Sequence, residues 1–65
     1  MNKIYIINYD MTINDALVQI ERNRHRSLIV LKCNKVVGTI SDGDIRRALI
    51  NDALGITVVS SIMNK

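Results

Sequence analysis

Three stretches rich in Ile, Val and Leu predict β-strands. Residues 28–31 form a continuous apolar run, the pattern of a strand that is buried on both faces. Residues 4–7 are a shorter run of β-branched and aromatic residues, and residues 36–40 return as a partner strand after the polar turn 32–35. Asn34 in this turn is able to adopt the left-handed conformation of a tight hairpin, so the second and third strands are expected to be antiparallel.

Two other segments have the apolar spacing of amphipathic helices, and each begins with the same kind of capping sequence. Thr12 and Asp15 are expected to cap a helix that ends near residue 23, and Ser41 and Asp44 a helix that ends at residue 50 or 51. Gly55 is expected to terminate the second helix. The positions predicted to be buried in the two helices are Ile13, Ala16, Leu17, Ile20, Ile45, Ala48 and Leu49.

The predicted element order is therefore β-α-β-β-α, an α+β fold in which two helices cover one face of a small three-stranded sheet. The first strand reaches the second through a helix, and such a crossover is expected to be right-handed. Residues 1–55 are predicted to form the domain, and residues 56–59 after it are extended or turn-like.

The composition of the chain indicates that this domain needs a partner. The chain has 65 residues, of which 48% are hydrophobic, and it contains no Phe or Trp. The core is therefore aliphatic, and a domain of this size is marginally stable alone. We expect a partner or a second copy of the chain to cover part of the apolar surface.

The charge pattern argues against a nucleic-acid-binding protein. The net charge of +3 is a mild excess, and the basic residues of the loop 22–26 and Lys35 have no aromatic stacking platform beside them. This loop is either a solvated connector or a source of one phosphate-contacting arginine. His25 has no second metal ligand at suitable spacing, so no metal site is expected.

The single cysteine and the absence of long apolar runs bear on the cellular compartment. Cys33 has no partner for an internal disulfide, which fits a reducing compartment. No stretch approaches the roughly 20 apolar residues of a membrane span, and the N-terminus does not have the apolar run of a signal peptide. We therefore expect a cytoplasmic protein that does not contact membranes.

The segment 38–47 is the first candidate for a binding site. It passes from a strand through a small polar turn into a helix, and the N–H groups of such a helix start are suited to phosphate. The alternative is that Ser41 and Asp44 only cap the helix. The pair Asp42 and Asp44 fits the charge bias of a helix N-terminus rather than a metal site. Catalysis is not indicated, because no phosphate-loop or dinucleotide fingerprint is present.

Three segments together resemble a CBS domain, the small repeat first named for cystathionine β-synthase. They are Thr12-Ile13-x-x-Ala16-Leu17, Leu28-Ile29-Val30 and the stretch from Val37 to Asp44, and the resemblance covers residues from about 4 to 50. The most specific part is a Gly-x-hydrophobic-Ser-x-x-Asp signature. The sequence Ser-Asp-Gly-Asp-Ile-Arg-Arg-Ala-Leu at 41–49 resembles that of repeats that accompany sugar-phosphate nucleotidyltransferases.

The resemblance implies a regulatory module that senses an adenine nucleotide (AMP, ADP or ATP) for an attached enzyme. In the family, the signature Asp binds the ribose hydroxyls and the signature Ser contacts phosphate, which implies these roles for Asp44 and Ser41. The candidate residues of the nucleotide site are Gly38, Ile40, Ser41, Asp44, Thr12 and Arg47. Arg47 is within reach of a phosphate, and the alternative is an exposed helix arginine without contact to the ligand. The alternative function is a ligand-free dimerisation or interaction module.

The resemblance also implies the partners of the chain. Family members usually pair two repeats in tandem, as a Bateman module, and residues 58–64 resemble the link into a second repeat. We therefore expect the chain to be the first repeat of such a pair, with 56–65 as the linker. A lone repeat is expected to pair with a second copy of itself.

Overall fold

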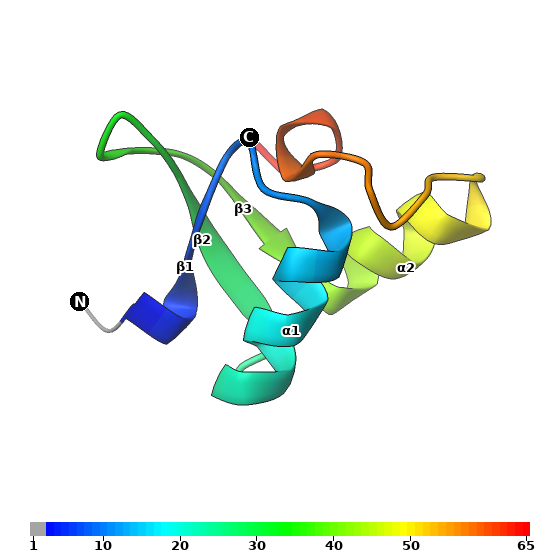
Figure 1. Ribbon diagram of the computed structural model, residues 1–65, viewed down its shortest axis with the longest axis horizontal. Coiled ribbons are helices and arrows are strands. Elements are labelled where there is room, and N and C mark those ends of the chain that lie inside the picture. The colour runs from blue at the N-terminus through cyan, green and yellow to red at the C-terminus, as the bar shows by residue number, and fades with distance from the viewer. Residues whose placement is uncertain (1–2) are drawn as a thin grey trace.

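The computed structural model describes residues 3–65, and these residues have the predicted α+β order β-α-β-β-α (Figure 1). Two short 3-10 helices, η1 and η2, are added near the ends of the chain. The elements are η1 (Lys3–Tyr5), β1 (Ile6–Asn8), α1 (Ile13–Asn23), β2 (Ser27–Lys32), β3 (Lys35–Ser41), α2 (Asp42–Ile50) and η2 (Val59–Ser61).

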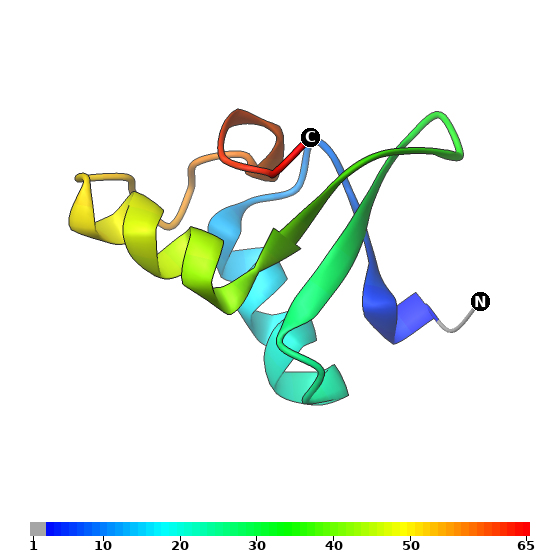
Figure 2. The same cartoon turned by 180° about the vertical axis from the view of Figure 1, so that it is seen from behind.

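The three strands form one sheet in the order β1-β2-β3. β1 is parallel to β2, and β2 is antiparallel to β3, so the predicted hairpin is confirmed. Its two-residue turn has Cys33 at φ 52° and Asn34 at φ 64°, the left-handed values that the tight turn requires. Both helices lie against the same face of the sheet, which leaves the opposite face open (Figures 1 and 2).

The core is aliphatic, as the composition predicts, but two helix positions were assigned to it wrongly. Leu17 and Leu49 are 39% and 43% exposed. They line a surface groove between α1 and α2, because three strands are too few to cover both flanks of the helices. The buried hydrophobic residues of the described chain are Ile7, Ile13, Ala16, Ile20, Leu28, Val30, Ile40, Ile45 and Val59.

Two boundaries also differ from the prediction. The first strand begins at Ile6 rather than Ile4, because residues 3–5 form η1 and the Ile4 carbonyl accepts a hydrogen bond from the Asn23 side chain at 2.8 Å. After α2 the left-handed conformation belongs to Asp52, at φ 71°, and not to Gly55. Gly55 instead approaches α1, where its carbonyl accepts the N–H of Asn14 at 3.0 Å.

The C-terminal segment, defined here as residues 55–64, crosses the domain from the start of α1 to the outer edge of β3 (Figure 2). Val59 anchors it, with a fully buried side chain, and its N–H donates to the Met11 carbonyl at 2.8 Å. At the far end Thr39 and Asn64 form an isolated antiparallel bridge. The role of 56–65 as a linker to a second repeat stays a prediction, but the segment itself packs on the domain.

Candidate functional site

The turn between β3 and α2 is held by a reciprocal capping box. Ser41 Oγ accepts the N–H of Asp44 at 3.1 Å, and Asp44 Oδ2 accepts the N–H of Ser41 at 2.9 Å. The first helical N–H, of Asp42, donates to the Arg26 carbonyl at 3.0 Å. Within residues 3–65 the N–H of Gly43 has no hydrogen-bond partner. This helix start therefore keeps one free donor for a ligand.

A polar cavity of about 620 Å³, called here the Asp44 cavity, lies beside this turn. Arg47 donates to Asp44 Oδ1, so each carboxylate oxygen of Asp44 already accepts one hydrogen bond. A carboxylate oxygen has room for a second one, which suits a hydroxyl donor. The cavity is lined by Asp44, Arg47, Ala48, Asn51, Ala53, Ile62 and Asn64.

The structure brings some of the predicted site residues together and separates others. Asp44 and Arg47 line the cavity, and Ser41 is the adjoining N-cap. Ile40 is fully buried, on the face of β3 that packs against the core. Gly38 is also buried, and a Cβ built there would lie 2.8 Å from the Asn64 carbonyl oxygen. Contacts of Gly38 and Ile40 with a nucleotide stay predictions.

Thr12 sits in an equivalent capping box at the start of α1, but this helix start is closed. The N–H groups of Ile13 and Asn14 donate to the carbonyls of Thr57 and Gly55, at 2.8 and 3.0 Å. The N–H of Asp15 donates to Thr12 Oγ1 at 3.2 Å. Hydrogen bonds from the backbone and hydroxyl of Thr12 lower the pKa of the Asp15 carboxyl below its ordinary value.

The sequence analysis did not assign Asn51, Ile62 or Asn64 to a site, although all three line the Asp44 cavity. Asn51 follows α2, where its side chain donates to the Arg47 carbonyl at 3.0 Å. Ile62 and Asn64 come from the C-terminal segment, which was assigned to a linker. Only the contact of that segment with β3 places them beside Asp44, and the resemblance of residues 58–64 to a link between repeats assigned neither residue to a site.

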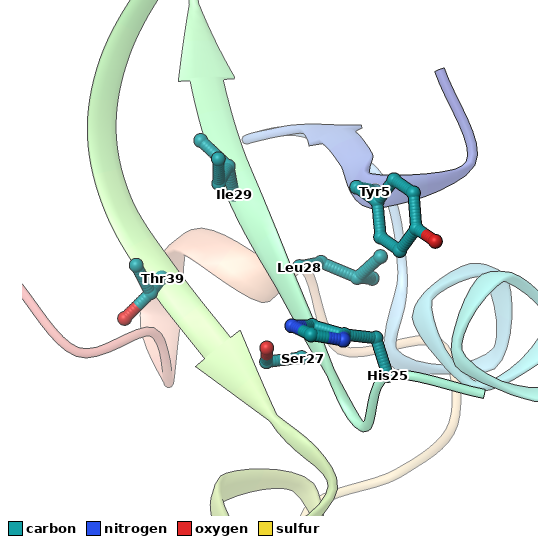
Figure 3. A pocket seen from close by; sticks show the side chains of 6 residues that line it. All are labelled: Tyr5, His25, Ser27, Leu28, Ile29 and Thr39. Carbon is teal, nitrogen blue, oxygen red and sulfur yellow. The ribbon is translucent and has the colours of Figure 1, made fainter. Parts of the chain in front are cut away.

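The open face of the sheet carries a second, more apolar cavity of about 400 Å³ (Figure 3). The rings of Tyr5 and His25 meet edge to face, with centroids 5.6 Å apart. Ser27, Leu28, Ile29 and Thr39 complete its lining. His25 belongs to the basic segment 22–26, whose first two residues end α1 and in which Arg24 and Arg26 have left-handed backbones.

Neither a metal-binding cluster nor a membrane-crossing helix is present among residues 3–65. Residues 3–65 contain no cluster of three or more His, Cys, Asp or Glu side chains that would hold a metal ion. Over the same residues, neither helix combines the length and the apolar character that crossing a bilayer requires.

Comparison with protein families gives one match, to the model described as "CBS domain", over residues 1–51. No curated protein sequence matches the chain. Several solved structures do match, and two of them cover almost all of the chain at 19% identity. One is a cystathionine beta-synthase domain protein fused to a Zn-ribbon-like domain, with a TM-score of 0.82 over 92% of this chain and 89% of the other.

The second is a CBS domain protein from Pyrobaculum aerophilum, solved in complex with AMP. Its TM-score is 0.84, over 92% of this chain and 48% of that one. A putative acetoin utilization protein from Vibrio cholerae gives a TM-score of 0.85 at 24% identity, over 92% and 46%. The TM-scores show that these proteins share the fold, and the chain spans about half the length of the last two.

Proposed function

The chain belongs to the CBS domain family, and on this basis we propose that it is a regulatory module that binds an adenine nucleotide beside the start of α2. The nucleotide is AMP, ADP or ATP, and its binding regulates an enzyme domain attached to the module. Catalysis belongs to that other domain. The relative from Pyrobaculum aerophilum, which was solved with AMP, supports the choice of nucleotide.

The observation that carries this proposal is the open start of α2 next to the Asp44 cavity. The free N–H of Gly43 and the positive end of the helix dipole favour a phosphate. Asp44 accepts the ribose hydroxyls, and Ser41 lies beside the phosphate. Arg47, whose side chain is 70% exposed, balances the charge of Asp44 and is free to turn toward the phosphate.

Calorimetric titration of AMP, ADP and ATP into the purified protein tests the proposal. We expect saturable binding that is weakened at least about tenfold in Asp44→Ala, because a charged hydrogen-bond acceptor contributes about 1.5–3 kcal/mol. Asp15→Asn is the matched control, since Asp15 holds the same capping position in the closed helix start of α1. Absence of binding by all three nucleotides, in a folded protein, contradicts the proposal.

The second candidate function is a ligand-free interaction module. Its support is a set of large apolar side chains left at the surface: Val18, Val36, Ile50, Leu54 and Ile56 are each between 58% and 74% exposed. Surface of this kind is typical of a protein interface. We propose that a second repeat or a second copy covers part of it, and sedimentation of the isolated chain as a stable monomer at micromolar concentration would contradict this pairing.

A further proposal concerns the class of the attached enzyme. The segment 41–49 resembles repeats that accompany sugar-phosphate nucleotidyltransferases, so we propose an enzyme of that class. The test is an activity assay of the whole protein with and without the nucleotide that binds. A response that Asp44→Ala removes supports regulation through this site, and an activity indifferent to the nucleotide opposes it.

A further inference from the structure

We propose that the thioether of Met63 is a modification site, where oxidation to the sulfoxide by a hydroperoxide releases the C-terminal segment from the edge of β3. The modification needs no nucleotide, so it goes beyond the proposed function. It rests on the packing of one sulfur atom against the strand at the point where the strand has no side chain.

Met63 lies over the one glycine of β3. A Cβ built at Gly38 would be 3.0 Å from Met63 Sδ and 3.2 Å from Met63 Cγ, so the methionine fills the space that another side chain would need. Met63 also packs against the core, and its N–H donates to the carbonyl of the buried Val59 at 2.8 Å. The thioether is therefore one of the contacts that hold the segment on the strand.

A sulfoxide does not fit this place as the thioether does. Oxidation turns an apolar, flexible side chain into a polar one with an additional oxygen atom. On this edge of β3 the N–H of Thr39 already donates to the Asn64 carbonyl at 2.9 Å, and a buried oxygen without a donor is unfavourable. The oxygen is accommodated when the side chain leaves the strand, and the neighbouring bridge between Asn64 and Thr39 opens with it.

The sulfur is within reach of a small oxidant, because Met63 is only half-buried. A lone pair of Sδ attacks one oxygen of the hydroperoxide, so that an S–O bond forms and the O–O bond breaks. The sulfur loses two electrons, the peroxide gains them, and the proton of the attacked hydroxyl passes to the leaving oxygen, which departs as water or an alcohol. Two thiols of a sulfoxide reductase system reverse the step and give the thioether, a disulfide and water.

Met11 is the internal comparison, since it contacts the same segment through its backbone. Its carbonyl accepts the N–H of Val59 at 2.8 Å, and its side chain is 37% exposed and lines a surface cavity beside β1. A sulfoxide at Met11 is able to turn into solvent, so its formation should leave the segment docked.

Hydrogen peroxide treatment of Cys33→Ser tests the proposal, because the exposed Cys33 thiol is a competing target. Peptide mapping by mass spectrometry should find one added oxygen on Met63. The amides of Thr39 and Asn64 should then exchange about tenfold faster or more, since burial of an unpaired polar group is unfavourable by that factor. The hydrogen-bonded amide of Arg24, at the end of α1, should not change. A sulfoxide reductase with a thiol should restore the original rates.

Three further variants, all made in Cys33→Ser, are each compared before and after peroxide. Met63→Leu keeps an apolar side chain that peroxide does not modify, so its exchange rates should be the same with and without the oxidant. Met11→Leu should respond to peroxide as Cys33→Ser does. Met63→Gln carries a polar group without any oxidant, so Thr39 and Asn64 should exchange fast from the start.

All of these measurements are made without nucleotide, so their outcome is independent of the proposed function. A Met63 that stays unmodified in the folded protein overturns the proposal. So does a sulfoxide at Met63 that leaves the exchange of Thr39 and Asn64 unchanged. A response to peroxide that Met11→Leu removes would place the site at Met11 and overturn it as well.

Discussion

Helices α1 and α2 begin with matching capping boxes, Thr12 with Asp15 and Ser41 with Asp44. At α1 the carbonyls of residues 55 and 57 occupy the first N–H groups, and the first helical residue, Ile13, is fully buried. At α2 the first helical residue is Asp42, which is partly exposed, and one N–H remains free. The first N–H groups of α1 are therefore already hydrogen-bonded within the fold, whereas the start of α2 keeps a free N–H for a ligand.

The difference teaches that a capping sequence does not by itself mark a binding site. Both boxes satisfy the same local need, the unpaired N–H groups of a first turn. What separates them is the C-terminal segment, whose carbonyls accept the first two N–H groups of α1 but leave the Gly43 N–H of α2 free. Four predictions test this comparison.

The largest expected effect is on stability, at the buried start of α1. Ile13→Ala should lower the free energy of unfolding by about 2–5 kcal/mol, since it leaves a cavity in the core. Asp42→Ala, at the equivalent position of α2, should cost only about 0.3–1 kcal/mol. Urea unfolding followed by circular dichroism measures both. Ile13→Val, with an expected cost of about 0.5–1.5 kcal/mol, serves if the alanine variant does not fold. Equal costs at the two positions would break the comparison.

The second effect distinguishes stability from binding. Thr12→Ala and Ser41→Ala should each cost about 0.5–2 kcal/mol of stability, because each removes an N-cap. Nucleotide affinity should fall further in Ser41→Ala, because the Thr12 hydroxyl already donates to Asp15 Oδ2 and accepts the Asp15 N–H. Unfolding and calorimetry on the same two variants test this, and an equal loss of affinity would place Thr12 in the site as well.

The third effect is a pH dependence that belongs to the α1 box. The pKa of Asp15 is lowered in the folded state, first by the backbone and then by the side-chain hydrogen bond of Thr12. Its stabilising contribution is therefore present above the ordinary carboxyl pKa of about 4 and is lost as the pH falls through the lower folded value. The urea midpoints of the unmodified protein and Asp15→Asn should converge as acid is added. A difference that persists at low pH would contradict this.

The smallest effect concerns the exposed flank of α2. Arg46 lies 3.5 Å from Asp42, and its side chain is 71% exposed. Arg46→Ala should cost no more than about 0.5 kcal/mol. That cost should disappear in about 1 M salt, which screens exposed charges. A larger or salt-independent loss would mean that the pair is more sheltered than the structure shows.

Most of the fold follows from local signals in the sequence. The two capping boxes mark the starts of both helices, and the apolar run 28–31 lies within β2. The hairpin turn is predictable because Asn34 tolerates a left-handed backbone. The errors at Leu17 and Leu49 arise because periodicity identifies an apolar face of a helix without saying how much of that face a sheet of three strands can cover.

The candidate site was less predictable, because part of it depends on contacts between distant segments. Asp44 and Arg47 belong to a recognisable stretch, and both line the cavity. Asn64 lines the cavity only because the C-terminal segment forms a bridge with Thr39, and no local sequence pattern predicts such a bridge. The tight approach at Gly38 is likewise visible only in three dimensions, although a glycine within a strand signals a close neighbour.

The closure of α1 by the C-terminal segment has a consequence for the order of folding. The acceptors of the Ile13 and Asn14 N–H groups lie almost at the opposite end of the chain. During synthesis, these two hydrogen bonds of α1 form only after residues 55–57 have emerged, whereas the β2–β3 hairpin needs only its own two-residue turn. Contacts between sequence-distant residues slow folding, so docking of the C-terminal segment is expected to be the late step that completes the domain.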